Sequence, residues 1–177
     1  IEGDVMKTKE ILDLIFKNPD VKYGLVEFGG IDFEKALSFS EENGKYFLTC
    51  LKRNKPIQVY SERKSAPEEI VRQLWLYKLI NYYEYKLAKI GVEKEIYFGT
   101  QIKEKAADIV IYQDDGITPR IIIECKKPNR EDGIDQLKSY LNAEGAPIGV
   151  WSNGAERVIL YRPYPKEFED TLTEIPK

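Results

Sequence analysis

Histidine is absent from the 177-residue sequence. This excludes mechanisms that need an imidazole within the sequence, such as Ser-His-Asp triads, Cys-His dyads and zinc hydrolases with histidine ligands. The two cysteines, Cys50 and Cys125, are too few for a zinc site or a disulfide framework. Any hydrolysis carried out by these residues would therefore depend on carboxylates, lysines and a hard metal ion.

Long apolar runs and an excess of positive charge are also missing. No stretch approaches the roughly 20 apolar residues of a membrane helix, and no signal peptide opens the sequence, so we expect a cytoplasmic protein without a membrane partner. Apolar residues make up 42% of the sequence, which predicts a globular domain with a real core. The net charge of −3 means that DNA binding would need clustered basic groups or the help of other domains.

The N-terminal third predicts a small β-rich extension over residues 1–62. A short helix is expected at residues 7–16, and a strand at residues 22–30 that two glycines end. The Asn43-Gly44 pair is a strong signal for a hairpin between two short strands. A further strand is expected at residues 55–60.

A long helix is the clearest expectation of the next segment, at residues 65–91. Ser65 is placed to cap it, Pro67 lies in its first turn, and Glu68 completes an S-x-x-E capping box. Gly91 is expected to end it.

The rest of the sequence predicts a mixed sheet with one helix crossing it. Strands are expected at residues 93–99, 105–112, 120–127, 147–154 and 157–162, with a helix at residues 130–142. The strand-helix-strand step predicts a parallel pair of strands. We expect a core domain at residues 63–162, and residues 163–177 to form an exit tail or linker whose apolar residues could still dock.

Two acidic residues on neighbouring strands indicate a metal site. Strand alternation puts Glu124 and Lys126 on one face and Cys125 on the other. In an antiparallel pair with Tyr112 opposite Arg120, Asp108 lies opposite Glu124, although a slip of one residue would separate them. Two adjacent carboxylates repel each other, and Mg²⁺ or Mn²⁺ would relieve the repulsion.

Lys126 would reach the same pocket, where an amine can orient or deprotonate a water, or stabilise charge on a phosphate. The peptide carbonyl of Cys125 is a further candidate metal ligand. By spacing alone, the same residues are equally typical of solvated strand ends and surface ion pairs.

The arrangement of Asp108 and Glu124-x-Lys126 on consecutive strands resembles the PD-(D/E)xK nuclease superfamily, with Ala107-Asp108 in place of Pro-Asp. A following Q-x-x-x-Y motif, Gln136 and Tyr140, strengthens the resemblance. These two residues are four apart and are expected to share a helix face opposite the apolar residues Ile134, Leu137 and Leu141.

The sequence is most similar in pattern to the N-terminal nuclease domain of the R subunit of type I restriction enzymes. That resemblance implies a restriction-endonuclease-like α/β fold, a mixed sheet flanked by helices, and Mg²⁺-dependent DNA cleavage. By motif position it implies these roles: Asp108 and Glu124 as metal ligands, Lys126 as the catalytic lysine, Glu69 rather than Glu68 as the helix acid, and Gln136 and Tyr140 as residues that position DNA or the catalytic lysine.

The resemblance also implies partners, namely DNA, a motor domain and methylation or specificity subunits. No G-x-x-x-x-G-K-[ST] loop is present, so we expect a separate domain, the nuclease part of a fused protein or a stand-alone relative. Two alternatives stay open: an inactive nuclease-like module for assembly or docking, and a nuclease for branched DNA or RNA. The basic residues expected near the site are Lys103, Lys105, Lys126, Lys127, Arg130 and Lys138.

Overall fold

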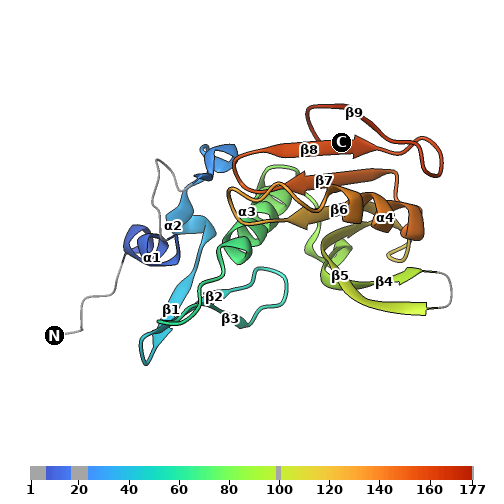
Figure 1. Cartoon of the computed structure of the whole chain (residues 1–177). Helices are drawn as coiled ribbons and strands as arrows, with labels where there is room; N and C mark the ends of the chain where they lie inside the picture. The colour runs from blue at the N-terminus through green and yellow to red at the C-terminus, as the bar shows by residue number, and fades with distance from the viewer. Residues whose placement is uncertain (1–6, 17–23, 99–100, 177) are drawn as a thin grey trace.

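The computed structural model describes residues 7–16, 24–98 and 101–176, with the backbone alone for residues 97–98 and 101–105. Within these ranges the chain is a mixed α/β protein with a three-stranded and a six-stranded sheet (Figure 1). The expected α/β class is confirmed. The six strands of the large sheet are β4 (Ile90–Phe98), β5 (Gln101–Tyr112), β6 (Pro119–Cys125), β7 (Ile148–Ser152), β8 (Arg157–Tyr161) and β9 (Glu169–Leu172).

The strands of the large sheet follow one another in sequence order. Among the described strands, only β6 and β7 run parallel, as predicted, and helix α4 (Ile134–Glu144) makes the connection between them. The other neighbours are antiparallel. The strand β6 is buried along most of its length because helices cover both faces of the sheet.

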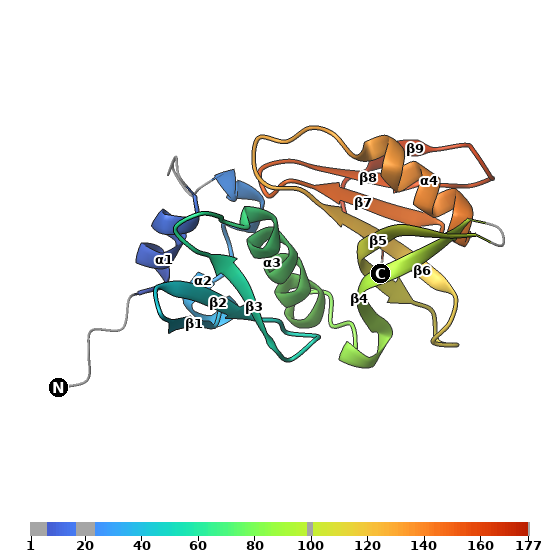
Figure 2. The same ribbon diagram turned by 60° about the horizontal axis from the view of Figure 1, so that its bottom comes forward.

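Helix α3 (Pro67–Asn81) lies between the two sheets (Figure 2). It is buried on several sides, which explains its weak amphipathic pattern. Alternate residues of β6 divide between two cores: Ile121 and Ile123 face α3, while Ile122 packs with α4. No described helix is long and apolar enough to cross a membrane.

The N-terminal residues combine short helices with a small sheet. Helix α1 (Thr8–Ile15), the Asn-Gly hairpin of β1 (Phe39–Glu42) and β2 (Lys45–Thr49), and strand β3 (Pro56–Tyr60) confirm the expected elements. The strand expected at residues 22–30 is wrong for its described part, where η2 (Val26–Phe28) is a 3-10 helix. Residues 22 and 23 lie outside the described ranges. Helix α2 (Phe33–Ala36) follows, with the side chain of Asp32 capping it.

The long helix ends ten residues earlier than expected. After Asn81 the chain turns, with Glu84 in the left-handed region, and a short 3-10 segment, η3 (Leu87–Lys89), leads into β4. Gly91 lies inside β4 rather than at the end of a helix. The aromatic rings of Tyr82 and Tyr83 stack edge to face at 5.0 Å, so local side-chain packing accompanies the turn that the periodicity did not reveal.

Residues 163–176 form a docked tail and not a free linker: β9 adds an edge strand to β8, and Ile175 is buried in the main core, as the expectation for the apolar residues of this segment allowed. Arg157 also forms an ion pair with Glu174 at 2.8 Å. The main core includes residues of α1, α3 and the large sheet together. The N-terminal extension therefore packs on the rest of the chain instead of forming a core of its own.

Candidate functional site

The pairing of β5 and β6 brings the two predicted carboxylates together. Ile109 pairs with Ile123, so Asp108 and Glu124 occupy the next positions of the same register. The expected register is confirmed along this part of the ladder. At its other end Tyr112 pairs with Pro119 rather than Arg120, because the register shifts there.

The backbone holds both carboxylates in place. The Cys125 N–H donates to Asp108 Oδ2 at 2.8 Å, and the Asp108 N–H points toward Glu124 Oε1 at 3.4 Å. The side chain of Cys125 is buried in the main core, as the alternation predicted. Each acid therefore contacts the strand that carries the other acid.

Glu124 is an unusual buried carboxylate, with 4% of its surface exposed. Burial and then the charge of Asp108 raise the pKa of Glu124 to about 8. Its hydrogen bond to Asp108 N–H is long, so its oxygens are poorly satisfied for a buried acid. A divalent cation would remove both costs.

The donor set fits Mg²⁺ or Mn²⁺. Such ions are commonly held by one or two carboxylates, with waters or substrate phosphates completing the shell. Within the described residues there is no group of three or more His, Cys, Asp or Glu side chains that could hold a metal. Asp108, Glu124 and the carbonyl of Cys125 would be the protein ligands.

Lys126 lines the same cleft as both acids. Its charge acts on Glu124 and opposes the rise of that residue's pKa. Its amine has no hydrogen-bond or ion-pair partner within the part of the chain that the structure describes. Gly133 leaves room for the lysine stem, since a Cβ on this glycine would lie 2.7 Å from Lys126 Cε.

Gln136 and Tyr140 also line the cleft and form a hydrogen bond, with Gln136 Nε2 donating to Tyr140 Oη at 2.7 Å. Tyr140 was expected to lie opposite the apolar face of the helix. It packs instead beside Leu137 and Leu141 in the second core. Burial, with the charges of Glu124 and Asp108, raises the pKa of Tyr140 to about 12. The pair thus joins the cleft to the core under α4.

The helix acid differs from the expectation. Glu68 lines the cleft, whereas Glu69 is 6% exposed and pairs with two arginines. The expected capping box is wrong, because the N-cap is Ala66 and no side chain caps the helix. Glu68 is therefore not occupied by capping, and by position it is the acid available to the cleft. The metal-water role predicted for Glu69 has no direct support in this placement.

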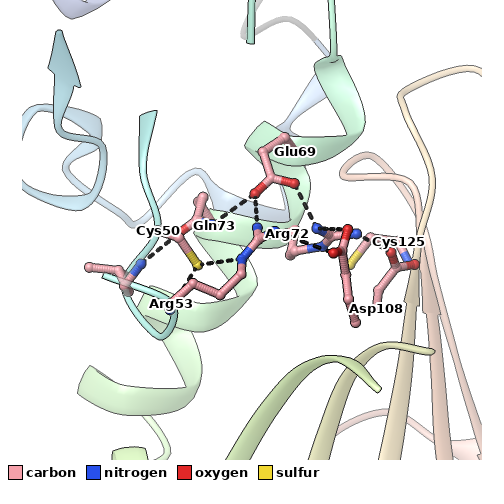
Figure 3. Close-up of polar contacts among 9 residues, drawn as sticks. Cys50, Arg53, Glu69, Arg72, Gln73, Asp108 and Cys125 are labelled. Carbon is pink, nitrogen blue, oxygen red and sulfur yellow. Dashed lines mark hydrogen bonds and ion pairs between the residues drawn. The ribbon is translucent and has the colours of Figure 1, made fainter. Parts of the chain in front are cut away.

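Arg72 was not predicted as a site residue. Its guanidinium donates to Asp108 Oδ1 at 2.6 Å and to Glu69 Oε2 at 2.8 Å (Figure 3). Arg53, from the turn after β2, reaches Glu69 from the other side at 2.5 Å. One feature of the sequence indicated a buried partner for Arg72, namely its position within the largely apolar stretch from Ile70 to Leu76. That position did not identify the partner.

The cleft has a volume of about 1060 Å³. Its lining combines the acids of the large sheet with Lys127 and Arg130 of the loop after β6, and with Ile15, Phe16 and Gly24 of the N-terminal residues. The loop is fixed to β7 and to the residue that follows it, because Trp151 donates to Asp132 O and Asn153 donates to Arg130 O, both at 2.8 Å.

The other expected basic residues contribute less to the described cleft. Lys138 lies over the ring of Phe168, with its amine 5.5 Å from the ring centroid, and is not among the residues that line the cleft. The structure does not describe the side chains of Lys103 and Lys105.

Gly24 joins the N-terminal wall to the loop after β6. Its φ is +69°, and a Cβ there would lie 2.9 Å from Pro128 Cβ. We expect Gly24→Ala to lower the free energy of unfolding by about 2–4 kcal/mol, through left-handed strain and overpacking together. Gly44→Ala is the matched control, because Gly44 has a φ of +77° and open space around it. Urea unfolding should show a loss of only about 1–2 kcal/mol for the control. Equal losses in both variants would contradict the contact with Pro128.

Residues 67–176 match the protein family described as "Type I restriction enzyme R protein N terminus (HSDR_N)". This match covers α3 and the large sheet, including every residue predicted for the site. A search of curated proteins finds no match. Since the matched residues make up more than half of the sequence, the chain belongs to the family of type I restriction enzyme R protein N-terminal domains.

Proposed function

We propose that the chain is the Mg²⁺-dependent DNA endonuclease domain of a restriction-modification system, with a PD-(D/E)xK site. The observation that carries the proposal is the adjacency of Asp108 and Glu124 in one cleft with Lys126. Family membership supports the restriction system and the nuclease class. An inactive module would have no need for a buried glutamate next to a second carboxylate, beside a lysine without a partner in the described chain.

The residues of the cleft suit hydrolysis of a phosphodiester. When bound by Asp108, Glu124 and the Cys125 carbonyl, Mg²⁺ supplies Lewis-acid stabilisation of charge on the phosphate. The Lys126 amine can donate to a phosphate oxygen or orient the attacking water. Glu68 can accept a hydrogen bond from a water in the cleft. Arg130, which is half exposed, can guide the DNA backbone toward the acids.

Cleavage of supercoiled plasmid tests the proposal. With the chain in excess and Mg²⁺ or Mn²⁺ present, we expect slow conversion to nicked or linear DNA, and no conversion in EDTA. Metal-independent cleavage, or no cleavage with either metal over long incubation, would contradict it.

The charge balance predicts that DNA binding by the chain alone is weak. Lys and Arg total 27 against 30 acids, and three basic residues, Lys126, Lys127 and Arg130, line the described cleft. A protein that contacts about 6–10 phosphates loses some 10³–10⁵ in affinity between 50 and 200 mM salt, so tight binding needs many cations. Other domains or subunits, such as a motor and specificity subunits, would supply the additional contacts needed for tight DNA binding.

A titration of labelled duplex measures this weak binding. At 150 mM salt, with Ca²⁺ replacing Mg²⁺ to prevent cleavage, we expect a Kd above roughly 1 μM. The Lys127→Glu/Arg130→Glu double variant is the comparison, and it should weaken binding further at low salt. Nanomolar binding by the chain alone would show that the proposed partners are not needed for affinity.

A further inference from the structure

Arg72 carries a positive charge directly into the carboxylate pair. Its guanidinium is 2.6 Å from Asp108 Oδ1, and its side chain is 9% exposed. At this distance and burial, a charge-assisted hydrogen bond is strong and poorly screened by salt. Asp108 thus already has a cationic partner on one oxygen, while the Cys125 N–H occupies the other.

The position of Arg72 is itself fixed from the opposite side. Glu69 accepts from Arg72 at 2.8 Å and from Arg53 at 2.5 Å, and Gln73 donates to the same acid at 3.1 Å. Glu93 contacts both arginines, at 3.1 and 3.5 Å. The network therefore begins at the turn after β2, outside the family match, and ends at Asp108 (Figure 3).

A count of charges shows what the network leaves open. Two arginines, Arg53 and Arg72, face four acids, namely Glu69, Glu93, Asp108 and Glu124. With Lys126 in the same cleft, one negative charge remains uncompensated when all four acids are ionised. The cluster therefore keeps a net negative charge that can attract a divalent cation.

We infer that Arg72 is the internal counter-cation of the metal-binding carboxylates, which offsets their mutual repulsion without metal and lowers their affinity for a divalent ion. The inference rests on the proposed function, since it assumes that Asp108 and Glu124 bind the metal. Arg72 does not need to leave its place for the metal to bind, because each carboxylate oxygen has a second lone pair. It repels the incoming ion instead.

Removing this charge should strengthen metal binding. In the Arg72→Met variant, Asp108 keeps its hydrogen bond from Cys125 N–H, and Glu69 keeps Arg53 and Gln73. The two acids therefore stay in position, while the repulsion between Arg72 and the incoming metal ion disappears. We expect the Kd for Mn²⁺ to fall by at least about tenfold, because charges this close interact strongly at a partly buried site. A purely structural role would predict weaker binding or no change.

The test is Mn²⁺ titration followed by electron paramagnetic resonance, with thermal unfolding in EDTA as a second readout. Arg72→Lys keeps the charge and should bind Mn²⁺ close to the wild-type affinity. Arg157→Met is the matched control, because Arg157 also pairs with two acids, Glu174 and Glu27, but contacts neither metal-binding carboxylate. The control should lower the Tm and leave the Kd unchanged.

Glu69→Gln gives an independent result of opposite sign, should Arg72→Met not fold. Neutralising Glu69 leaves the charge of Arg72 less compensated, so Mn²⁺ binding should weaken by several-fold or more. Wild-type or weaker affinity in folded Arg72→Met, or tighter binding in Glu69→Gln, would overturn the inference alone. Failure of the wild-type chain to bind Mn²⁺ would overturn the proposed function as well, which distinguishes the two.

Discussion

Glu124→Gln is expected to abolish metal-dependent cleavage and to stabilise the metal-free protein. Glutamine keeps the shape of the side chain but removes the charge that attracts Mg²⁺. Because a bound metal contributes several kcal/mol of transition-state stabilisation, we expect the cleavage rate to fall by at least about 10³-fold. Plasmid cleavage with the chain in excess measures this loss. The exposed Asp114→Asn variant is the control, and it should cleave like the wild type.

The stability effect follows from the raised pKa of Glu124. In the folded state burial and the charge of Asp108 raise this pKa to about 8, against 4.5 for the ordinary group. The folded protein therefore binds this proton more tightly than the unfolded chain. The stability this provides is fully present below pH 4.5 and is lost as the pH rises through about 8.

Urea unfolding in EDTA at pH 5 and pH 9 measures the stability difference. The wild-type protein should lose a few kcal/mol of stability over this range that Glu124→Gln does not lose. Cleavage by Glu124→Gln at the wild-type rate would remove the basis of the metal site. A pH dependence equal to that of the wild type would show that Glu124 is not strained by its surroundings.

Asp108→Asn should also abolish cleavage, but its effect on stability has the opposite sign. Loss of either acid relieves the repulsion between the two carboxylates, but Asp108 also has a stabilising partner. In the structure Asp108 compensates the buried charge of Arg72 at 2.6 Å. Removing one partner of a buried ion pair leaves a charge without compensation, so the asparagine variant should be less stable. Neutralising Glu124 should therefore stabilise the metal-free fold, whereas neutralising Asp108 should destabilise it.

The part of the fold that the sequence predicts well is the part that alternation and turn chemistry control. The apolar alternation of β5 and β6, joined by a turn-rich loop, leaves one register that buries Ile109, Ile121 and Ile123 on the same face. Asp108 and Glu124 follow from that register. The Asn43-Gly44 hairpin is equally local, since both residues adopt the positive φ that such turns need.

The errors occur where tertiary packing decides the outcome. The pattern of residues 65–91 continues as a helix, yet the chain leaves it after Asn81 and enters β4 at Ile90. The tail after residue 162 has a polar, proline-rich composition, but β8 offers a free edge and the core accepts Ile175. Neither partner is visible in the local sequence.

The Arg53–Glu69–Arg72 network could not be predicted for a similar reason. Its members are separated along the chain, and they meet only because α3 packs between the two sheets. A charged residue in a buried helix indicates that some partner exists. It does not say which one, so Glu69 was assigned to the cleft when its carboxylate in fact lies between two arginines.

Lys126→Met is expected to separate catalysis from metal binding. The lysine amine has no hydrogen-bond or ion-pair partner among the described residues, and it lines the cleft together with both acids. If it donates to charge that develops in the transition state, its loss should lower the cleavage rate by about 10²–10³-fold. The Kd for Mn²⁺ should not rise, because a nearby positive charge is removed and no ligand is lost.

Lys127→Met is the matched control for Lys126. Lys127 is exposed and lines the same cleft, so it has access to the DNA backbone without sharing the strand face of Glu124. We expect a change of only a few-fold in rate, and one that diminishes as salt is raised, since an exposed charge is screened. If Lys126 contributed only to DNA binding, Lys126→Met and Lys127→Met would lower the cleavage rate to a similar extent. A folded Lys126→Met variant that cleaves within tenfold of the wild type, or that no longer binds Mn²⁺, would exclude the catalytic role and leave Lys126 as a structural charge beside Glu124.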